Sequence, residues 1–236
     1  MTDVPTEGTA PIEVLRWAVA RYPRVGFSTG FGPEGCVLVD LIGRHRLAID
    51  IFTLDTGRLP KQTHDLIAEV RRRYGLDIEM FTPWPGSVDS YVEQFGIDGF
   101  YDAVDARKAC CAVRKVEPLR RALAHRRGWI TGLRREQADS RATLSETEHD
   151  AATGKWKFSP LADWSNDDVW NYLRANRVPY NALHDRGYPS IGCEPCTRAV
   201  KPGEHPRAGR WWWENDGARK ECGLHEIPIK VLENVA

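Results

Sequence analysis

The chain has 236 residues, of which 42% are hydrophobic, so it can bury a core the size of one large α/β domain. Lys plus Arg and Asp plus Glu both total 33, and this balance argues against a polynucleotide partner, although local basic clusters could still hold a small anion. No apolar run approaches the roughly 18 residues of a membrane helix, and residues 1–10 lack the apolar segment of a secretion signal. We therefore expect a cytoplasmic protein, in whose reducing surroundings patterned cysteines serve as metal ligands or redox catalysts.

Apolar spacing divides the sequence into alternating helices and strands. Apolar residues at helical spacing and helix start signals predict helices in residues 12–22, 36–42, 60–74, 87–95 and 105–125. Short apolar runs predict strands at 24–27, 48–54, 77–81 and 128–131, and residues 156–160 are expected to be extended. Ser165 and Asp168 are typical of a capping box that opens a helix through Arg174. The alternation predicts an α/β fold with a mainly parallel sheet flanked by helices.

Three loops follow the expected strands directly. The first, Ser28–Gly35, is rich in small residues and leads into a helix, so its backbone N–H groups and the helix dipole could form an anion cradle. An ordinary turn between strand and helix would have the same pattern. The second, Asp55–Arg58, also lies at a strand tip, where ligands bind in doubly wound sheets. The third, Gly132–Gln137, is basic and could offer backbone or guanidinium donors to phosphate.

The helical pattern over 105–125 carries Cys110 and Cys111 in tandem, and Pro118 should kink or break it. Adjacent helical residues point about 100° apart. Their sulfurs are therefore poorly placed to share one zinc ion, whose tetrahedral sulfurs lie about 3.8 Å apart, whereas a larger iron–sulfur cluster accepts that spread more easily. Arg114 and Lys115 follow the cysteines at i+4 and could lean over a cluster or an anion, or could form a solvated basic face.

Five of the six cysteines stand in patterned positions. Cys193 and Cys196 form a second close pair, so four thiols arrive as two pairs from distant parts of the chain, which is what a closed metal site needs. Cys222, near Lys220 and His225, is a candidate nucleophile. The sixth, Cys36, lies in an apolar helix and is expected to be a buried packing residue. The run Trp211–Trp213 is expected to serve packing more than chemistry.

The sequence resembles the assimilatory adenylyl-sulfate (APS) reductases of the phosphoadenylyl-sulfate/adenylyl-sulfate reductase family over nearly the whole chain after residue 20. The segments that carry the resemblance are Leu54–Arg58, Lys108–Cys111 with Arg114–Leu119, Gly132–Arg135, Cys193–Cys196 and Lys220–His225. It implies an adenine nucleotide α-hydrolase-like fold and one four-iron four-sulfur cluster on Cys110, Cys111, Cys193 and Cys196. It also implies Cys222 as the nucleophile and thioredoxin, or a glutaredoxin-like protein, as the reductant.

The implied reaction reduces adenylyl sulfate to sulfite and AMP through an S-sulfocysteine intermediate, in sulfate assimilation and cysteine biosynthesis. The residues expected to contact the substrate are Ser28, Thr29, Gly30, Leu54, Thr56, Gly57, Arg58, Lys115, Gly132, Arg207 and Arg210. The expected organisation is a flexible N-terminus over 1–10, a nucleotide-binding and iron–sulfur domain over 11–202, and a mobile tail over 203–236 with the catalytic cysteine. Assembly into a homo-oligomer is left open.

Two other enzyme classes and a binding module are the alternatives. Phosphoadenylyl-sulfate (PAPS) reductases typically lack both cluster cysteine pairs. A zinc-stabilised tRNA thiolation enzyme that uses ATP would need the Ser-Gly-Gly-x-Asp-Ser loop of ATP pyrophosphatases, from which Ser28–Gly35 departs. The missing acidic residue argues against magnesium-dependent ATP cleavage, and no P-loop replaces it. A non-catalytic nucleotide-binding module would leave the Cys222 thiol unexplained.

Overall fold

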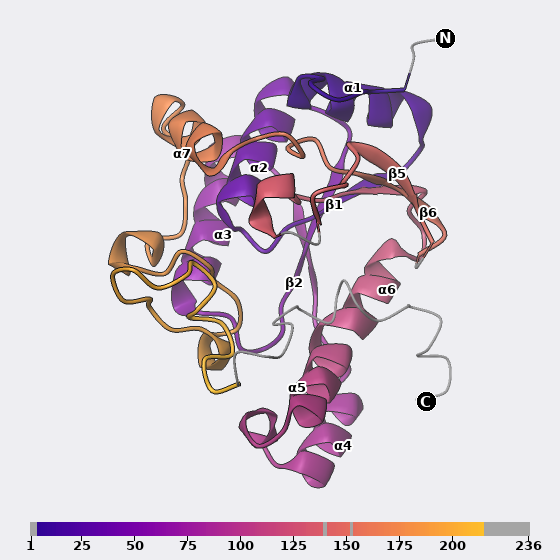
Figure 1. Ribbon diagram of the computed structural model, residues 1–236. Helices are drawn as coiled ribbons and strands as arrows, with labels where there is room; N and C mark the ends of the chain where they lie inside the picture. The colour runs from indigo at the N-terminus through magenta and orange to yellow at the C-terminus, as the bar shows by residue number, and fades with distance from the viewer. Residues whose placement is uncertain (1–3, 139–140, 152, 215–236) are drawn as a thin grey trace. The chain divides into compact units, whose positions relative to one another are not determined.

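The computed structural model describes residues 4–138, 141–151 and 153–214 (Figure 1). The contacts between Cα atoms divide the chain into two units. The first, called here the sheet unit, comprises Met1–Thr53, Thr63–Glu79 and Leu123–Asn181. The second, called the cysteine unit, comprises Leu54–Gln62, Met80–Ala122 and Ala182–Ala236. Each unit is therefore built from three separate stretches of sequence, and each is described by itself.

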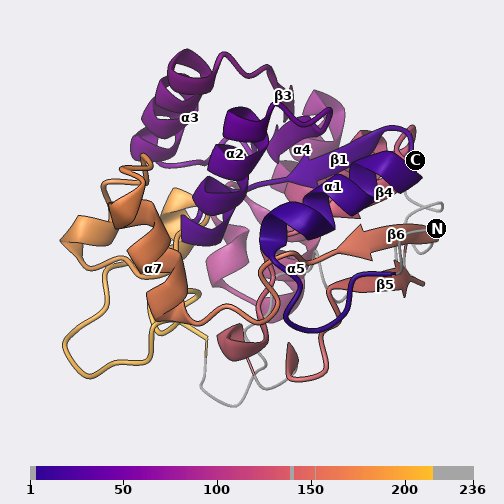
Figure 2. The ribbon, with the colours of Figure 1, turned by 90° about the horizontal axis from the view of Figure 1, so that it is seen from above.

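The sheet has six strands in the order β3-β2-β1-β4-β6-β5, and Figure 2 shows several of them from above. Their bounds are β1 Val25–Ser28, β2 Asp50–Leu54, β3 Ile78–Phe81, β4 Gly128–Ile130, β5 Thr147–Asp150 and β6 Lys155–Phe158. Strand β1 pairs in parallel with β2 and β4, and β4 pairs in parallel with β6. The pair of β5 and β6 runs antiparallel. The predicted mainly parallel sheet is thus confirmed.

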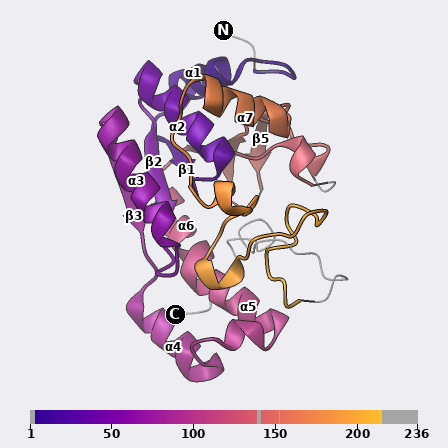
Figure 3. The same ribbon diagram turned by 90° about the vertical axis from the view of Figure 1, so that its left-hand side faces the viewer.

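The sheet unit contains α1 Pro11–Arg21, α2 Pro33–His45, α7 Asn166–Ala175 and all but the first residues of α3 Lys61–Tyr74. Helices α2 and α7 pack against each other (Figure 3). A buried carboxylate, that of Asp40 on α2, accepts hydrogen bonds from the hydroxyls of Tyr74 at 2.8 Å and Tyr172 at 2.7 Å. Three helices therefore meet at one carboxylate whose charge is well satisfied.

Helix α2 is buried at every position from Gly35 to Ile42. This explains why its sequence, apart from Asp40, is apolar on all sides rather than along one stripe. Cys36 belongs to this buried stretch, and burial raises the pKa of its thiol far above the usual range. The prediction that Cys36 is a packing residue is confirmed, because a buried thiol that keeps its proton is a poor nucleophile.

The cysteine unit is mainly helical. It contains α4 Pro85–Phe95, α5 Val104–Cys111 and most of α6 Glu117–Leu123, and α4 packs beside α5 (Figure 1). Residues Ala112–Val116 form a π-helical segment between α5 and α6. Short 3₁₀ turns of the chain lie at Gly99–Tyr101, Arg135–Gln137, His184–Arg186 and Glu194–Cys196. None of the described helices is both long and apolar enough to cross a membrane.

The break predicted at Pro118 takes the form of this π-helical segment. Proline has no N–H to donate, and its ring collides with the carbonyl four residues earlier in a regular α-helix. The wider π turn just before Pro118 relieves that conflict, and it begins immediately after Cys111. The single helix expected over 105–125 is therefore three consecutive segments.

Strand β5 was not anticipated from the sequence. Its residues, Thr147–Asp150, lack the alternation of apolar side chains that marks a strand with one buried face. The strand lies at the sheet edge, where Glu148 stands opposite Lys157 of β6 and accepts a hydrogen bond from its Nζ at 2.9 Å. A cross-strand ion pair thus accompanies the pairing in place of apolar burial.

The first testable prediction concerns the capping box of α7, which is confirmed. The Ser165 hydroxyl accepts a hydrogen bond from the Asp168 backbone N–H at 3.1 Å, and the Asp168 carboxylate accepts one from the Ser165 N–H at 2.8 Å. Ser165→Ala should lower the free energy of unfolding by about 1 kcal/mol, because a first-turn N–H of α7 loses its acceptor. Urea unfolding monitored by circular dichroism measures this loss.

The matched control is Ser90→Ala on the exposed face of α4, where the hydroxyl donates only to the Gly86 carbonyl within the same helix. We expect the control to change the free energy of unfolding by less than about 0.5 kcal/mol. Equal losses in the two variants would contradict the assigned role of the cap.

Candidate functional site

Four cysteines line one cavity within the cysteine unit: Cys110, Cys111, Cys193 and Cys196. Two are the last residues of α5, and the other two are the N-cap and the last residue of the 3₁₀ turn Glu194–Cys196. Cys111 and Cys193 are buried, and the other two thiols are partly exposed. The structure therefore brings together the two sequence pairs, which lie about 80 residues apart in the chain. Their role as metal ligands stays a prediction.

Local interactions fix the turn that presents Cys193 and Cys196. Pro195 stands in the first turn, where its missing N–H costs nothing. The Cys196 N–H donates to the Cys193 carbonyl at 3.0 Å, and the Glu194 N–H donates to the Arg58 carbonyl at 2.8 Å. The Tyr101 hydroxyl donates to the Pro195 carbonyl at 2.8 Å. The turn is thus held both by the loop after β2 and by the helical part of the unit.

Polar and cationic side chains surround the thiols. The cavity is lined by Arg58, Arg107, Arg114 and Lys115 in addition to the cysteines. Thr56 Oγ1 lies 3.2 Å from Cys193 Sγ, at hydrogen-bond distance. Arg107 and Cys111 lie four residues apart on α5 and so share a helix face beside the cavity. Positive charge and hydrogen-bond donors favour thiolates over thiols, so the lining is suited to sulfur in its anionic form.

Burial opposes this effect. It raises the pKa of Cys196 to about 12, with the neighbouring Cys193 as the next cause, and burial likewise raises the pKa of Cys110, against the lowering effect of Arg114. These two thiols keep their protons at neutral pH unless a stronger positive charge displaces them. A bound metal does this, because metal binding to cysteine releases the protons.

The donor set bears on which metal group the cavity fits. In the described part of the chain, no three or more His, Cys, Asp or Glu side chains are arranged to hold a single metal ion. The buried Trp211 also lines the cavity, and its Nε1–H has no hydrogen-bond partner among the described residues. Four thiols around one cavity with a spare N–H donor fit a metal–sulfur cluster, whose sulfur atoms accept hydrogen bonds.

In the sheet unit, the loop after β1 has the predicted arrangement of strand, loop and helix start. Helix α2 begins at Pro33 after the N-cap Gly32, and no side chain caps its first N–H groups. The Thr29 hydroxyl is buried and accepts the Phe31 N–H at 3.0 Å. The first turn of α2 therefore keeps backbone donors that an anion could use.

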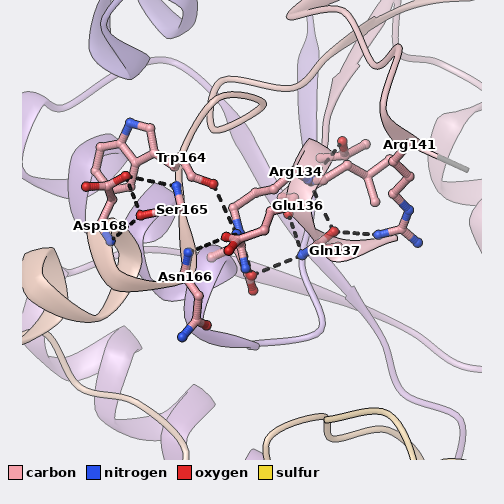
Figure 4. Close-up of polar contacts among 12 residues, drawn as sticks. Arg134, Glu136, Gln137, Arg141, Trp164, Ser165, Asn166 and Asp168 are labelled. Carbon is pink, nitrogen blue, oxygen red and sulfur yellow. Dashed lines mark hydrogen bonds and ion pairs between the residues drawn. The ribbon is translucent and has the colours of Figure 1, made fainter. Parts of the chain in front are cut away.

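The loop Gly132–Gln137 is fastened to α2 by hydrogen bonds to Glu34, and Figure 4 shows its Arg134 beside Glu136 and Trp164. Arg134 donates through Nε to Glu34 at 2.8 Å, and through Nη1 to Glu136 at 2.9 Å and to the Trp164 carbonyl at 3.0 Å. Gln137 donates to the same Glu34 oxygen at 3.0 Å. A Cβ on Gly132 would stand 3.1 Å from the Cβ of Glu34, so the loop approaches α2 closely at a glycine. Arg134 thus holds the loop in place by donating hydrogen bonds to three acceptor groups of the protein.

The predicted substrate residues fall into two groups. Ser28, Thr29, Gly30 and Gly132 belong to the sheet unit, whereas Leu54, Thr56, Gly57, Arg58, Lys115, Arg207 and Arg210 belong to the cysteine unit. Arg58 donates to the Ile97 carbonyl at 2.6 Å, and Arg210 lies over the ring of the buried Trp211, 4.8 Å from its centroid. Arg207 is partly exposed. Cys222 lies outside the described residues, so its predicted role is not tested.

Sequence reasoning missed two residues that line the cavity, Arg107 and Phe100. A signal existed for Arg107, because it precedes Cys110 by three positions and so shares a helix face with the cysteines. Phe100 lies in a 3₁₀ turn with no periodic pattern. Its position depends on packing, including the Arg58 guanidinium 4.9 Å from its ring centroid.

Comparisons with known proteins identify relatives over most of the chain. Residues 24–199 match the family model described as phosphoadenosine phosphosulfate reductase domain. The adenosine 5'-phosphosulfate reductase of Allochromatium vinosum is 55% identical, with 94% of this chain and 86% of that protein covered. The protein of the same name from Burkholderia cepacia is 54% identical, with 90% and 84% covered.

Two solved structures have related folds. The phosphoadenylyl-sulfate (PAPS) reductase of Candida auris, solved as a phosphate complex, aligns with a TM-score of 0.70 and 32% identity over 82% of this chain and 91% of that one. The FMN adenylyltransferase of Candida glabrata aligns with a TM-score of 0.54 and 15% identity over 86% and 72%. The second likeness concerns the fold alone, and both agree with the predicted α/β fold, a mainly parallel sheet flanked by helices.

The second prediction concerns the Arg134 network of the sheet unit. Arg134→Ala should lower the free energy of unfolding by about 3 kcal/mol, because it leaves the Glu34 carboxylate, whose side chain is only 16% exposed, without its cation. Chemical denaturation measures the change. The control Arg16→Ala breaks a pair with Glu13 that is half exposed on both sides, so it should cost less than about 0.5 kcal/mol. A loss below about 1 kcal/mol in Arg134→Ala would contradict the network's role.

Proposed function

The chain belongs to the phosphoadenosine phosphosulfate reductase family, and on that premise we propose that it is an adenylyl-sulfate reductase, which converts APS to sulfite and AMP. The observation that carries the proposal is the cavity lined by four cysteines, in a chain about half identical to relatives named adenosine 5'-phosphosulfate reductase. The protein works in sulfate assimilation, leading to cysteine biosynthesis, and is cytoplasmic.

The resident group is one four-iron four-sulfur cluster, held by Cys110, Cys111, Cys193 and Cys196. The donor set supports this assignment, because four thiols line one cavity together with four cationic side chains. When bound, the cluster supplies fixed charge beside the site. The two electrons of the reaction come from thiol exchange. Thr56 orients the sulfur of Cys193 by hydrogen bonding.

The chemistry itself takes place at Cys222. Its thiolate attacks the sulfur of APS, so that an S–S bond forms while the S–O bond to the phosphate breaks and AMP leaves with the electron pair. A dithiol reductant of the thioredoxin or glutaredoxin-like class then attacks the Cys222 sulfur. Sulfite leaves, and the second thiol of the reductant closes its disulfide and restores the Cys222 thiol. Atoms and electrons balance, because the dithiol loses the two electrons that sulfite gains.

Charge on the leaving AMP must be held for this step to be fast. In the sheet unit, the backbone N–H groups of Ser28–Gly30 and of Gly132 are the proposed donors to the nucleotide. In the cysteine unit, Lys115, Arg207 and Arg210 are the proposed cations for phosphate and sulfate, and Leu54, Thr56, Gly57 and Arg58 complete the contacts. Arg114 is already engaged, because it donates to the Thr56 carbonyl at 2.8 Å.

The proposal distinguishes APS from PAPS as substrate. The sequence identity to the PAPS reductase of Candida auris is 32%, well below the 54–55% identity to the two relatives named adenosine 5'-phosphosulfate reductase. The two cysteine pairs also favour APS, by the family resemblance described above. Absorbance of protein purified without oxygen tests the cluster directly: a brown protein supports it, and a colourless zinc protein would favour the tRNA thiolation alternative.

The third prediction concerns the ligands. Cys193→Ser should lose most of its iron, because one thiolate of a closed site is gone and the turn at Cys196 is no longer tied to α5 through metal. Iron and sulfide assays on anaerobically purified protein measure this. Cys36→Ser is the matched control, since Cys36 is buried in the sheet unit and should leave the iron content unchanged. Full iron content in Cys193→Ser would rule out its role as a ligand.

The fourth prediction separates binding from chemistry. Cys222→Ser should bind APS and keep its cluster but release no sulfite, because a hydroxyl is far less nucleophilic than a thiolate. Wild-type protein mixed with APS and no reductant should gain one sulfo group, about 80 Da, on the peptide that contains Cys222. Mass spectrometry detects the adduct. An adduct on Cys36, or AMP release without any adduct, would be incompatible with the mechanism.

A further inference from the structure

A buried ion pair joins the helix of the first two cysteines to the last described residue of the chain. Arg107 of α5 donates through Nε to Glu214 Oε1 at 2.7 Å and through Nη2 to Oε2 at 3.2 Å. The side chains are only 1% and 3% exposed. Two parallel bonds between a planar guanidinium and a carboxylate fix the orientation of both groups.

Each partner is also attached to the cysteine cavity. Arg107 lines the cavity together with Cys111 of the same helix, and it lies over the ring of Trp211 at 4.7 Å from its centroid. On the other side, the Glu214 N–H donates to the Trp211 carbonyl at 3.0 Å. The Trp211 N–H in turn donates to the Cys196 carbonyl at 3.4 Å. The segment Arg210–Glu214 therefore contacts both cysteine pairs, one through Arg107 and the other through its own backbone.

A buried ion pair is a poor source of stability, because removing two charges from water costs about as much as their attraction returns. Such a pair instead fixes the relative position of its two side chains, because a guanidinium and a carboxylate form two parallel hydrogen bonds in few arrangements. Here the geometry concerns residues 210–214, the last residues that the structure describes, and Cys222 comes eight positions after Glu214 in the sequence. The carboxylate of Glu214 also neutralises the charge of Arg107. Arg107 therefore binds a group of the protein itself rather than a bound anion.

We propose that Arg107 and Glu214 are positioning residues, which fix residues 210–214 against the cysteine cavity and thereby fix the point in the chain from which the sequence continues to Cys222. The inference rests on the proposed function, because Cys222 has to be the nucleophile. It adds two residues to the proposed mechanism, and the contribution of Glu214 is to the rate of the first chemical step, with substrate binding and iron content left intact.

The experiment compares Glu214→Gln with wild-type protein. Both are purified without oxygen, assayed for iron, titrated with APS, and mixed with saturating APS in a rapid-quench device. The rate of sulfo-adduct formation on the Cys222 peptide is measured by mass spectrometry and expressed per iron-loaded chain. We expect the adduct rate to fall roughly 10- to 100-fold, because small misplacements of a nucleophile cost factors of this size. Iron content and the Kd for APS should stay within about twofold, since Glu214 contacts no cysteine directly.

Two further variants make the result specific. Glu204→Gln is the matched control, because Glu204 forms a bidentate pair with Arg198 in the same unit, at 2.8 and 3.1 Å, but with both side chains about 30% exposed. It should react at the wild-type rate. Glu214→Asp keeps the charge but shortens the side chain, so its adduct rate should lie between those of Glu214→Gln and wild type. If Glu214→Gln fails to fold, the adduct rate of Glu214→Asp tests the inference in its place.

An unchanged adduct rate in a folded Glu214 variant would overturn the inference. A fall in rate that merely parallels a loss of iron would also overturn it, because the pair would then serve the cavity alone. Failure of the proposed function has a different outcome, since the wild-type protein itself would then form no adduct on Cys222.

Discussion

The cysteine unit depends on keeping four sulfur atoms in one partly buried cavity. Burial favours the protonated thiol, and the raised pKa values of Cys110 and Cys196 express this cost. The surrounding cations reduce it, and each guanidinium is held by a partner of its own. Arg58 is held by the Ile97 carbonyl, Arg107 by Glu214 and Arg114 by the Thr56 carbonyl. The positive lining is therefore fixed before any ligand arrives, which is the condition for strong electrostatic stabilisation.

The regular part of the fold was predictable because its signals are local. Helical spacing, a capping box at Ser165 and short apolar runs located the helices and all the parallel strands to within a few residues. Strand β5 was missed because its residues are polar and pair only with a neighbour at the sheet edge. Pro118 indicated a break, but the form of that break, a π-helical segment over Ala112–Val116, is not specified by any local pattern.

The candidate site was predictable where residue type alone carries the chemistry. Two cysteines close together are easily recognised in a sequence, and in the structure both pairs line one cavity. The partner of Arg107 could not be found in this way, because arginine and glutamate are common and 107 positions separate this pair. Trp211 is buried as a packing residue, as its sequence context indicated, but it also contacts Arg107 and the cavity. Arg134 shows the opposite case, since a basic loop residue that suggested phosphate binding is engaged with Glu34 and Glu136.

The order of the cysteines along the chain has a consequence for biosynthesis. Cys110 and Cys111 precede Cys193 by about 80 residues, and the cavity wall ends only at Trp211. At roughly 5–20 residues per second, a ribosome needs about 4–16 s to add the second pair. During that interval the first pair of cysteines has no second pair to complete the cavity. Under the proposed function, iron therefore meets the complete set of ligands only late in synthesis, so the supply of reductant and iron during translation bears on how much intact protein each round yields.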